Sequence, residues 1–133
     1  MHISTKGRYA LIIMTELAKH QSEDKYITLK EIASNNKLSI KYLERIMGSL
    51  NKADYFFSSR GIDGGYKLKH ELAYYKIGDI IRLAEGDIKV VDCLGNSLFS
   101  CPAKKKCKTY TLWNDLNNLI NDYLDSKTLE DII

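Results

Sequence analysis

The chain has 133 residues, of which 44% are hydrophobic and 28% charged, and a formal net charge of +3. This balance is typical of one folded domain, or one domain with an appendage, and it excludes a disordered chain. The first 20 residues contain an apolar run of only five residues, at 10–14, so we expect neither a signal peptide nor a membrane span. We therefore expect a cytoplasmic protein, in which clustered cysteines more often bind metal than form disulfides.

The charge is uneven along the chain. Residues 1–70 contain 12 lysines and arginines against seven aspartates and glutamates, whereas residues 71–133 contain eight against ten. A basic half is typical of proteins that bind a polyanion such as nucleic acid. A solvated surface without a polyanion partner gives the same count.

Three helices are predicted in the first 54 residues. Residues 4–20 carry an apolar stripe at helical spacing, and Thr28 with Glu31 forms a capping-box pattern that begins a short second helix. Ser39 is a cap for a third helix, whose expected core face is Ile40, Leu43, Ile46, Met47, Leu50 and Ala53. Two helices joined by a short turn fit the helix-turn-helix pattern, which small helical bundles also produce.

A glycine-rich hairpin is predicted directly after these helices. The stretch YFFSSRGIDGGYKL, residues 55–68, reads as strand, turn and strand, with Asp63-Gly64 as a hairpin dipeptide. Helix, turn, helix and hairpin in this order predict a winged helix, mainly α with a small β-hairpin. Arg60 then lies at the tip of the wing, where a guanidinium suits a narrow minor groove; the alternative is a solvated loop charge.

The exposed face of the third helix supplies candidate DNA contacts. Residues near the start of a recognition helix meet base edges in the major groove. Arg45 suits a guanine edge and Glu44 a cytosine amine, while Tyr42 and Ser39 suit phosphates, and Lys41 lies on the same face. The alternative for Glu44 is a simple surface charge.

A long C-terminal helix is predicted after a shorter one. Residues 76–88 read as a short helix that Gly86 closes, and residues 109–126 carry a helical apolar stripe: Leu112, Trp113, Leu116, Leu119, Ile120, Tyr123 and Leu124. A long helix after a winged helix more often pairs with a partner chain, which sets two recognition helices about 34 Å apart on a palindromic operator. The alternative is a stripe that packs on its own domain. We expect a DNA-binding domain at 1–75, followed by a loop and dimerisation helix at 76–133.

All three cysteines lie between these two helices. Cys93, Cys101 and Cys107 have the spacing Cys-x7-Cys-x5-Cys, without the Cys-x2-Cys pair usual in structural zinc sites. A wider loop suits an iron–sulfur cluster, and the lysines that flank Cys107 favour thiolates. Free redox thiols and a zinc site with a borrowed ligand are the alternatives.

Several segments together resemble the Rrf2 family of bacterial transcription regulators: MHISTKGRYAL, LSIKYLERIM, SRGIDGGYKL, the cysteine loop, LWNDL and LDSKTLEDII. The resemblance implies a homodimeric winged-helix repressor of double-stranded DNA, with a 2Fe–2S cluster on Cys93, Cys101 and Cys107. Ser39, Tyr42, Glu44 and Arg60 match DNA-contacting positions of the family. Lys41 and Arg45 stand where IscR-type members of the family have neutral residues, so we expect the preferred operator to differ from theirs.

Two branches of the family compete. The cysteine loop looks like the IscR-type branch, which senses iron–sulfur status, but its first gap is two residues longer, and Tyr110 replaces a histidine ligand. The fourth ligand is then Tyr110, a carboxylate such as Asp92 or Asp115, or an exogenous thiol. Both chain ends resemble the CymR-type branch, cysteine-metabolism repressors that have no cluster and act with a cysteine-synthase-type enzyme.

An enzyme is not expected. The sequence shows no nucleophile–base constellation, and the glycines at 61–65 belong to a hairpin, without the strand-to-helix context of a phosphate-binding loop.

Overall fold

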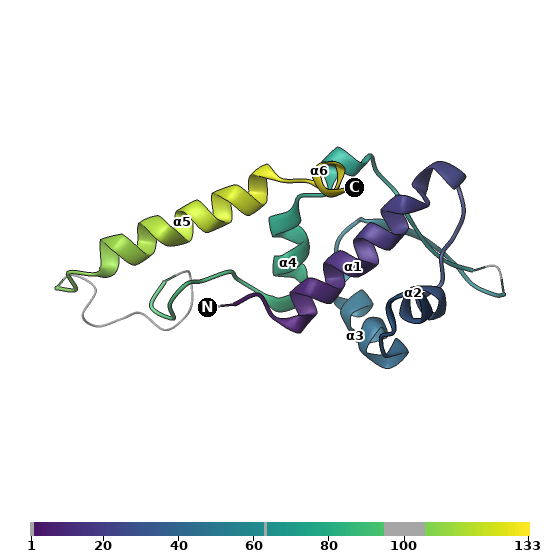
Figure 1. Ribbon diagram of the computed structural model, residues 1–133, viewed down its shortest axis with the longest axis horizontal. Helices are drawn as coiled ribbons and strands as arrows, with labels where there is room; N and C mark the ends of the chain where they lie inside the picture. The colour runs from purple at the N-terminus through teal and green to yellow at the C-terminus, as the bar shows by residue number, and fades with distance from the viewer. Residues whose placement is uncertain (1, 63, 95–105) are drawn as a thin grey trace.

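The computed structural model describes residues 2–62, 64–94 and 106–133. Its elements follow in chain order: α1 (Thr5–Lys19), the 3-10 helix η1 (Gln21–Glu23), α2 (Leu29–Asn36), α3 (Ile40–Leu50), β1 (Phe56–Ser59), β2 (Gly65–Leu68), the 3-10 helix η2 (Leu72–Tyr74), α4 (Ile77–Glu85), α5 (Tyr110–Ser126) and α6 (Leu129–Ile132). The predicted helices and hairpin are all present (Figure 1).

Side-chain caps fix where the first three helices begin. Thr28 Oγ1 accepts a hydrogen bond of 3.0 Å from the Glu31 N–H, and Ser39 Oγ accepts one of 3.4 Å from the Tyr42 N–H, so both predicted caps are confirmed. Ser4 caps α1 in the same way. The complete capping box expected for Thr28 and Glu31 forms instead at α6, between Thr128 and Asp131. These caps satisfy N–H groups that have no partner inside the helix, so the start of α3 is set by local sequence.

The hairpin forms the wing of a winged helix. β1 and β2 pair antiparallel, with Phe56 opposite Leu68 and Ser59 opposite Gly65. Ile27 adds a bridge, because it exchanges two backbone hydrogen bonds of 2.8 Å with Tyr66. Gly65 has φ of +127°, and a Cβ there would collide with the Ile27 carbonyl. The wing is thereby attached to the segment that leads into α2.

Helices α1 to α4 share one apolar core. Its most buried members include Ala10, Ile13, Met14, Ile32, Leu43, Leu50, Tyr75 and Ile80, each 0% exposed. The predicted face of α3 is confirmed at Leu43, Ile46, Met47 and Leu50. Ile40 is 39% exposed, against expectation, because it is the first residue of α3 and the helix reaches the core only a turn later.

Helix α5 contacts α4 with its C-terminal part, and its N-terminal part projects away from the core (Figure 1). None of its residues is buried. The predicted apolar stripe divides into two faces: Ile120 and Leu124 are half-buried against the core, whereas Leu112, Leu116, Leu119 and Tyr123 are 59%, 38%, 68% and 62% exposed. Within the described ranges, no helix is both long enough and apolar enough to cross a membrane.

Candidate nucleic-acid interface and cysteine segment

Helix α3 exposes the predicted contact residues on one surface. Lys41, Glu44 and Arg45 are exposed, as is Ser39 at the N-cap. Tyr42 is half-buried, because its ring packs edge-on against Tyr9 of α1, with 5.5 Å between centroids. The core face of α3 holds the helix in place, so these polar side chains point outward from a fixed backbone.

The N-terminus of α1 lies beside α3, which the sequence analysis missed. Lys6 and Tyr42 line a shallow depression of about 490 Å³, and Lys6 also lies near Arg45 around a smaller hollow. A carboxylate oxygen of Glu85 accepts hydrogen bonds from the Ser4 N–H (3.0 Å), the Gly7 N–H (3.2 Å) and the Ser4 hydroxyl. No local pattern around Lys6 marks its place beside α3, because the two helices are far apart in sequence.

The wing presents Arg60 and Ile62 to solvent. Gly61 between them has φ of +101°, a conformation that glycine adopts without strain. Ile62 is 99% exposed. The predicted turn residue Asp63 lies outside the described residues. Arg60 therefore lies at the end of the hairpin that points away from the core.

Two wing lysines are engaged by neighbouring carboxylates. Lys67 contacts Asp24 at 2.6 Å, and Lys69 contacts Asp54 at 2.5 Å. The hydrogen bond from Lys67 holds the pKa of the Asp24 carboxyl below its usual value. In the part of the chain that the structure describes, no such ion pair involves Lys41, Arg45 or Arg60. Their charges remain available to a polyanion.

Two of the three cysteines lie in described parts of the chain. Cys93 follows α4 in a turn, where the Leu94 N–H donates to the Val91 carbonyl, and Cys107 precedes α5. Both are half-buried free thiols. The Cys107 sulfur lies 3.3 Å from the Thr109 hydroxyl, and hydrogen bonds from that hydroxyl and nearby N–H groups lower the thiol pKa. The third predicted ligand, Cys101, lies outside the described residues.

The candidates for a fourth ligand differ in placement. Tyr110 begins α5, is half-buried, and donates its N–H to the Cys107 carbonyl at 3.4 Å. Asp92 and Asp115 are exposed. His70, the nearest histidine in sequence, is engaged elsewhere, because its Nε2 lies 2.8 Å from the Asp54 carbonyl.

The described residues contain no group of three ligating side chains. The predicted set includes Cys101, so it falls partly outside them. The donors that are described suit an iron–sulfur cluster, which thiolates hold: Cys93 and Cys107 are unpaired, and the pKa of Cys107 is already lowered.

Nearly the whole chain is similar to known proteins. The Rrf2 profile, described as an iron-dependent transcriptional regulator, matches residues 3–133. The HTH-type transcriptional regulator CymR of Bacillus subtilis strain 168 is 44% identical over 132 residues, which are 99% of this chain and 89% of that protein.

Solved structures give the same result. CymR (YrzC) of B. subtilis, described as its global cysteine regulator, superposes with a TM-score of 0.79 at 43% identity, covering 99% of this chain and 95% of that one. IscR of T. potens superposes with a TM-score of 0.75 at 36% identity, covering 99% and 85%. Both structures support the fold described above.

Proposed function

The chain belongs to the Rrf2 family of transcriptional regulators, and we propose that it is a homodimeric repressor whose DNA affinity depends on an iron–sulfur cluster. The observation that carries the DNA-binding part is the outward surface of α3 together with the wing. It presents Lys41, Arg45 and Arg60 without carboxylate partners among the described residues. Exposed cations without carboxylate partners favour phosphate and base-edge contacts.

Each polar residue of this surface has a proposed role. Arg45 donates to a guanine edge and Glu44 accepts from a cytosine amine. Ser39, Lys41 and Tyr42 bind phosphates and fix the register of α3 in the major groove. Arg60 enters the adjacent minor groove. In this proposal residues 1–75 bind DNA, and residues 76–133 control the affinity.

The exposed face of α5 is the proposed dimer interface. Leu112, Leu116, Leu119 and Tyr123 form a continuous apolar strip on a helix with no buried residue. A strip of this kind is typical of a helix that packs on a second copy. A two-fold axis then pairs two recognition helices with the two halves of a palindromic operator.

Control by a 2Fe–2S cluster is supported by the cysteine segment. Cys93, Cys101 and Cys107 would hold the cluster, with Tyr110, Asp92, Asp115 or an exogenous thiol as fourth ligand. When bound, the cluster supplies a one-electron redox centre that responds to iron and oxygen. The chain's own part would be to favour the thiolate form, and at Cys107 hydrogen bonds from Thr109 lower the pKa of the thiol.

Purification without oxygen tests the cluster. We expect a coloured protein with iron and sulfide in equal amounts, and loss of the visible absorption in Cys93→Ala. Tyr110→Phe separates the ligand candidates, because its spectrum changes only if the phenol is a ligand. A colourless, iron-free protein that still binds its operator would contradict cluster control while leaving DNA binding intact.

The second candidate is a CymR-like regulator of cysteine metabolism without a cluster. The 44% identity with B. subtilis CymR over 99% of the chain favours it. In this case a cysteine-synthase-type enzyme would control DNA affinity, and iron would have no effect. Titration of the operator complex with such an enzyme, in iron-free buffer, distinguishes the two candidates.

A further inference from the structure

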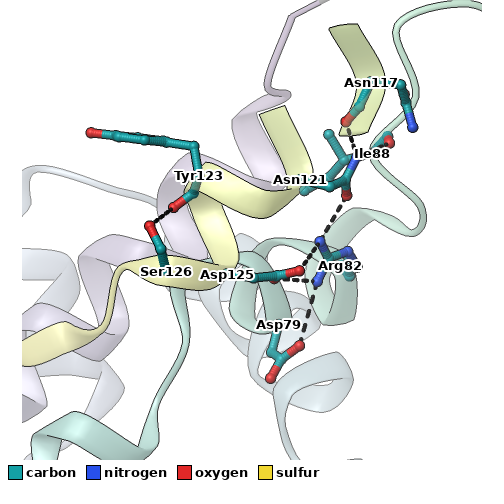
Figure 2. A network of polar contacts seen from close by, with 8 residues as sticks. All are labelled: Asp79, Arg82, Ile88, Asn117, Asn121, Tyr123, Asp125 and Ser126. Carbon is teal, nitrogen blue, oxygen red and sulfur yellow. Dashed lines mark hydrogen bonds and ion pairs between the residues drawn. The ribbon is translucent and has the colours of Figure 1, made fainter. Parts of the chain in front are cut away.

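A row of polar side chains joins α5 to α4 and to the segment that leads into the cysteines. Arg82 of α4 donates to both carboxylate oxygens of Asp125, at 2.8 and 3.1 Å, and to the side-chain oxygen of Asn121, at 2.7 Å. Asn121 donates in turn to the Ile88 carbonyl at 3.0 Å, and Asn117 accepts from the Val90 N–H at 2.9 Å. Figure 2 shows this row on one side of α5, with Tyr123 pointing away from Arg82.

One end of the row reaches the cysteine segment. Val90 is three residues before Cys93, and its N–H is held by Asn117 rather than by another part of the backbone. Ile88 and Leu94, which flank this stretch, are 6% and 3% exposed. A shift of Cys93 therefore acts on Val90 and, through Asn117, on α5.

The other end reaches the DNA-reading surface. Arg82 lies on α4, which packs against both α1 and α3. Ala84 of α4 lies near Arg45 and Ser49 of α3, and Glu85 of α4 caps the N-terminus of α1. Any rotation of α4 thus moves groups that position α3 and Lys6.

This row packs tightly against the backbone of α4 at Asp125, unlike isolated contacts on a protein surface. A Cβ on Gly78 would collide with the Asp125 carboxylate and lie 3.0 Å from Arg82 Nη1. Hydrogen bonding by Asp125 raises the pKa of Arg82 further. Directional polar contacts of this kind fix one orientation of a helix and exchange partners more readily than a packed apolar core does.

We propose that Arg82, Asn117 and Asn121 are positioning residues that couple Cys93 and the described stretch around it, residues 88–94, to recognition helix α3. Among the described residues, their side-chain hydrogen bonds go to Asp79, Asp125, Ile88, Val90 and one another, and none goes to Cys93 or Cys107. This inference rests on the proposed DNA-binding function but requires no cluster, because the coupling is a property of the chain itself. Thermodynamic linkage makes the coupling reciprocal, so bound DNA must change the environment of Cys93.

The test measures the rate at which iodoacetamide alkylates Cys93, in the full-length reduced protein, with and without saturating duplex DNA. The duplex is one that the wild-type protein selects from a random-sequence pool, and peptide mass spectrometry resolves Cys93 from the other thiols. We expect DNA to change the wild-type rate about fivefold or more, a typical coupling strength. In the double variant Asn117→Ala/Asn121→Ala, the logarithm of the ratio of the two rates should fall to less than about half of its wild-type value.

Two further variants serve as controls. Asn118 is an exposed neighbour on α5, so Asn118→Ala should keep the wild-type response. Asn117→Asp retains an acceptor for the Val90 N–H and should restore much of the response that Asn117→Ala loses. Thermal unfolding and sedimentation of each variant verify that fold and dimer persist, and an unfolded double variant is replaced by Asn117→Ala alone.

Each remaining outcome decides against the inference. A wild-type rate that DNA leaves unchanged shows that no coupling exists, although DNA binding itself survives. A DNA effect that persists in the double variant shows that the duplex covers Cys93 directly. If the wild-type protein selects no duplex, the proposed function fails first, and the coupling fails with it.

Discussion

The reading head and α5 differ in the contacts that stabilise them. The reading head, which comprises α1 to α3 and the wing, shares with α4 a core that has members such as Ile13, Leu43 and Ile80 at 0% exposure. Helix α5 has no buried residue; Ile120 and Leu124 are half-buried against the core, and Arg82 of α4 donates hydrogen bonds to Asn121 and Asp125.

This difference has consequences for what each region can do. A close-packed core permits few alternative arrangements, so the wing, α3 and α4 should move as one body, and a shift of α4 carries α3 with it. Helix α5 has hydrogen bonds to α4 on one face and an apolar strip on the other. Its position can therefore respond both to a shift of α4 and to a second copy that packs on the strip. The molecule therefore combines a rigid DNA-reading surface with an attached helix that is suited to transmit a signal.

Among the proposed variants, loss of a core side chain should lower the free energy of unfolding most. Leu43→Ala removes a fully buried side chain from α3 and should lower the free energy of unfolding by about 2–5 kcal/mol, because a cavity remains. Chemical denaturation monitored by circular dichroism measures it. Ile120→Ala, at a half-buried position on α5, is the matched comparison. An equal loss there would contradict the proposed contrast between the two regions.

A charge on the outer face of α5 should separate the subunits. Leu119 is 68% exposed, so Leu119→Glu leaves the reading head folded but places an acid in the proposed dimer interface. We expect the dimer dissociation constant to rise about tenfold or more, equivalent to about 1.4 kcal/mol, as measured by analytical ultracentrifugation. Asn118→Glu, one residue earlier, is the control, and a fully dimeric Leu119→Glu would exclude this face.

Removal of the wing arginine should weaken DNA binding without affecting the fold. Arg60 is exposed at the end of the hairpin, so Arg60→Ala should cost about 1–3 kcal/mol of operator affinity if the wing reads the groove. Fluorescence anisotropy with a labelled duplex measures this change. Lys69→Ala, at a wing lysine already paired with Asp54, should have a smaller effect. Unchanged binding in Arg60→Ala would remove the wing from the interface.

The smallest effect concerns alkaline pH and the base of the wing. Burial raises the pKa of Tyr55 to about 12, whereas an unfolded tyrosine titrates near pH 10. The neutral phenol therefore stabilises the fold below pH 10, and this contribution is lost as pH rises from 10 to about 12. Tyr55→Phe should make this fall in unfolding free energy shallower, and Tyr123→Phe should not.

Local sequence predicted the reading head well. Caps at Thr28 and Ser39 act within four residues, and the stripe of α3 repeats at the helical period, so both follow from short segments. The failure at Ile40 has the same origin, because periodicity alone does not say where along a helix the core begins. The wing followed from its glycines, but its bridge to Ile27 did not.

Contacts between distant segments were not predictable. Asn117, Asn121 and Asp125 lie four residues apart on one face of α5 and read as a solvated face, because nothing near them in sequence marks Arg82 as their partner. Lys6 was missed for the same reason, since only folding brings α1 beside α3. The DNA contacts and the cysteine ligands remain predictions.

The central claim is that the state of the cysteines controls the affinity of α3 and the wing for DNA. The most direct measurement is the Kd of the anaerobically purified dimer for a selected duplex, before and after chelation removes its iron. We expect the two Kd values to differ about fivefold or more, and Cys93→Ala to abolish the difference. Identical affinities, with iron shown to be present in one sample and absent from the other, would contradict it.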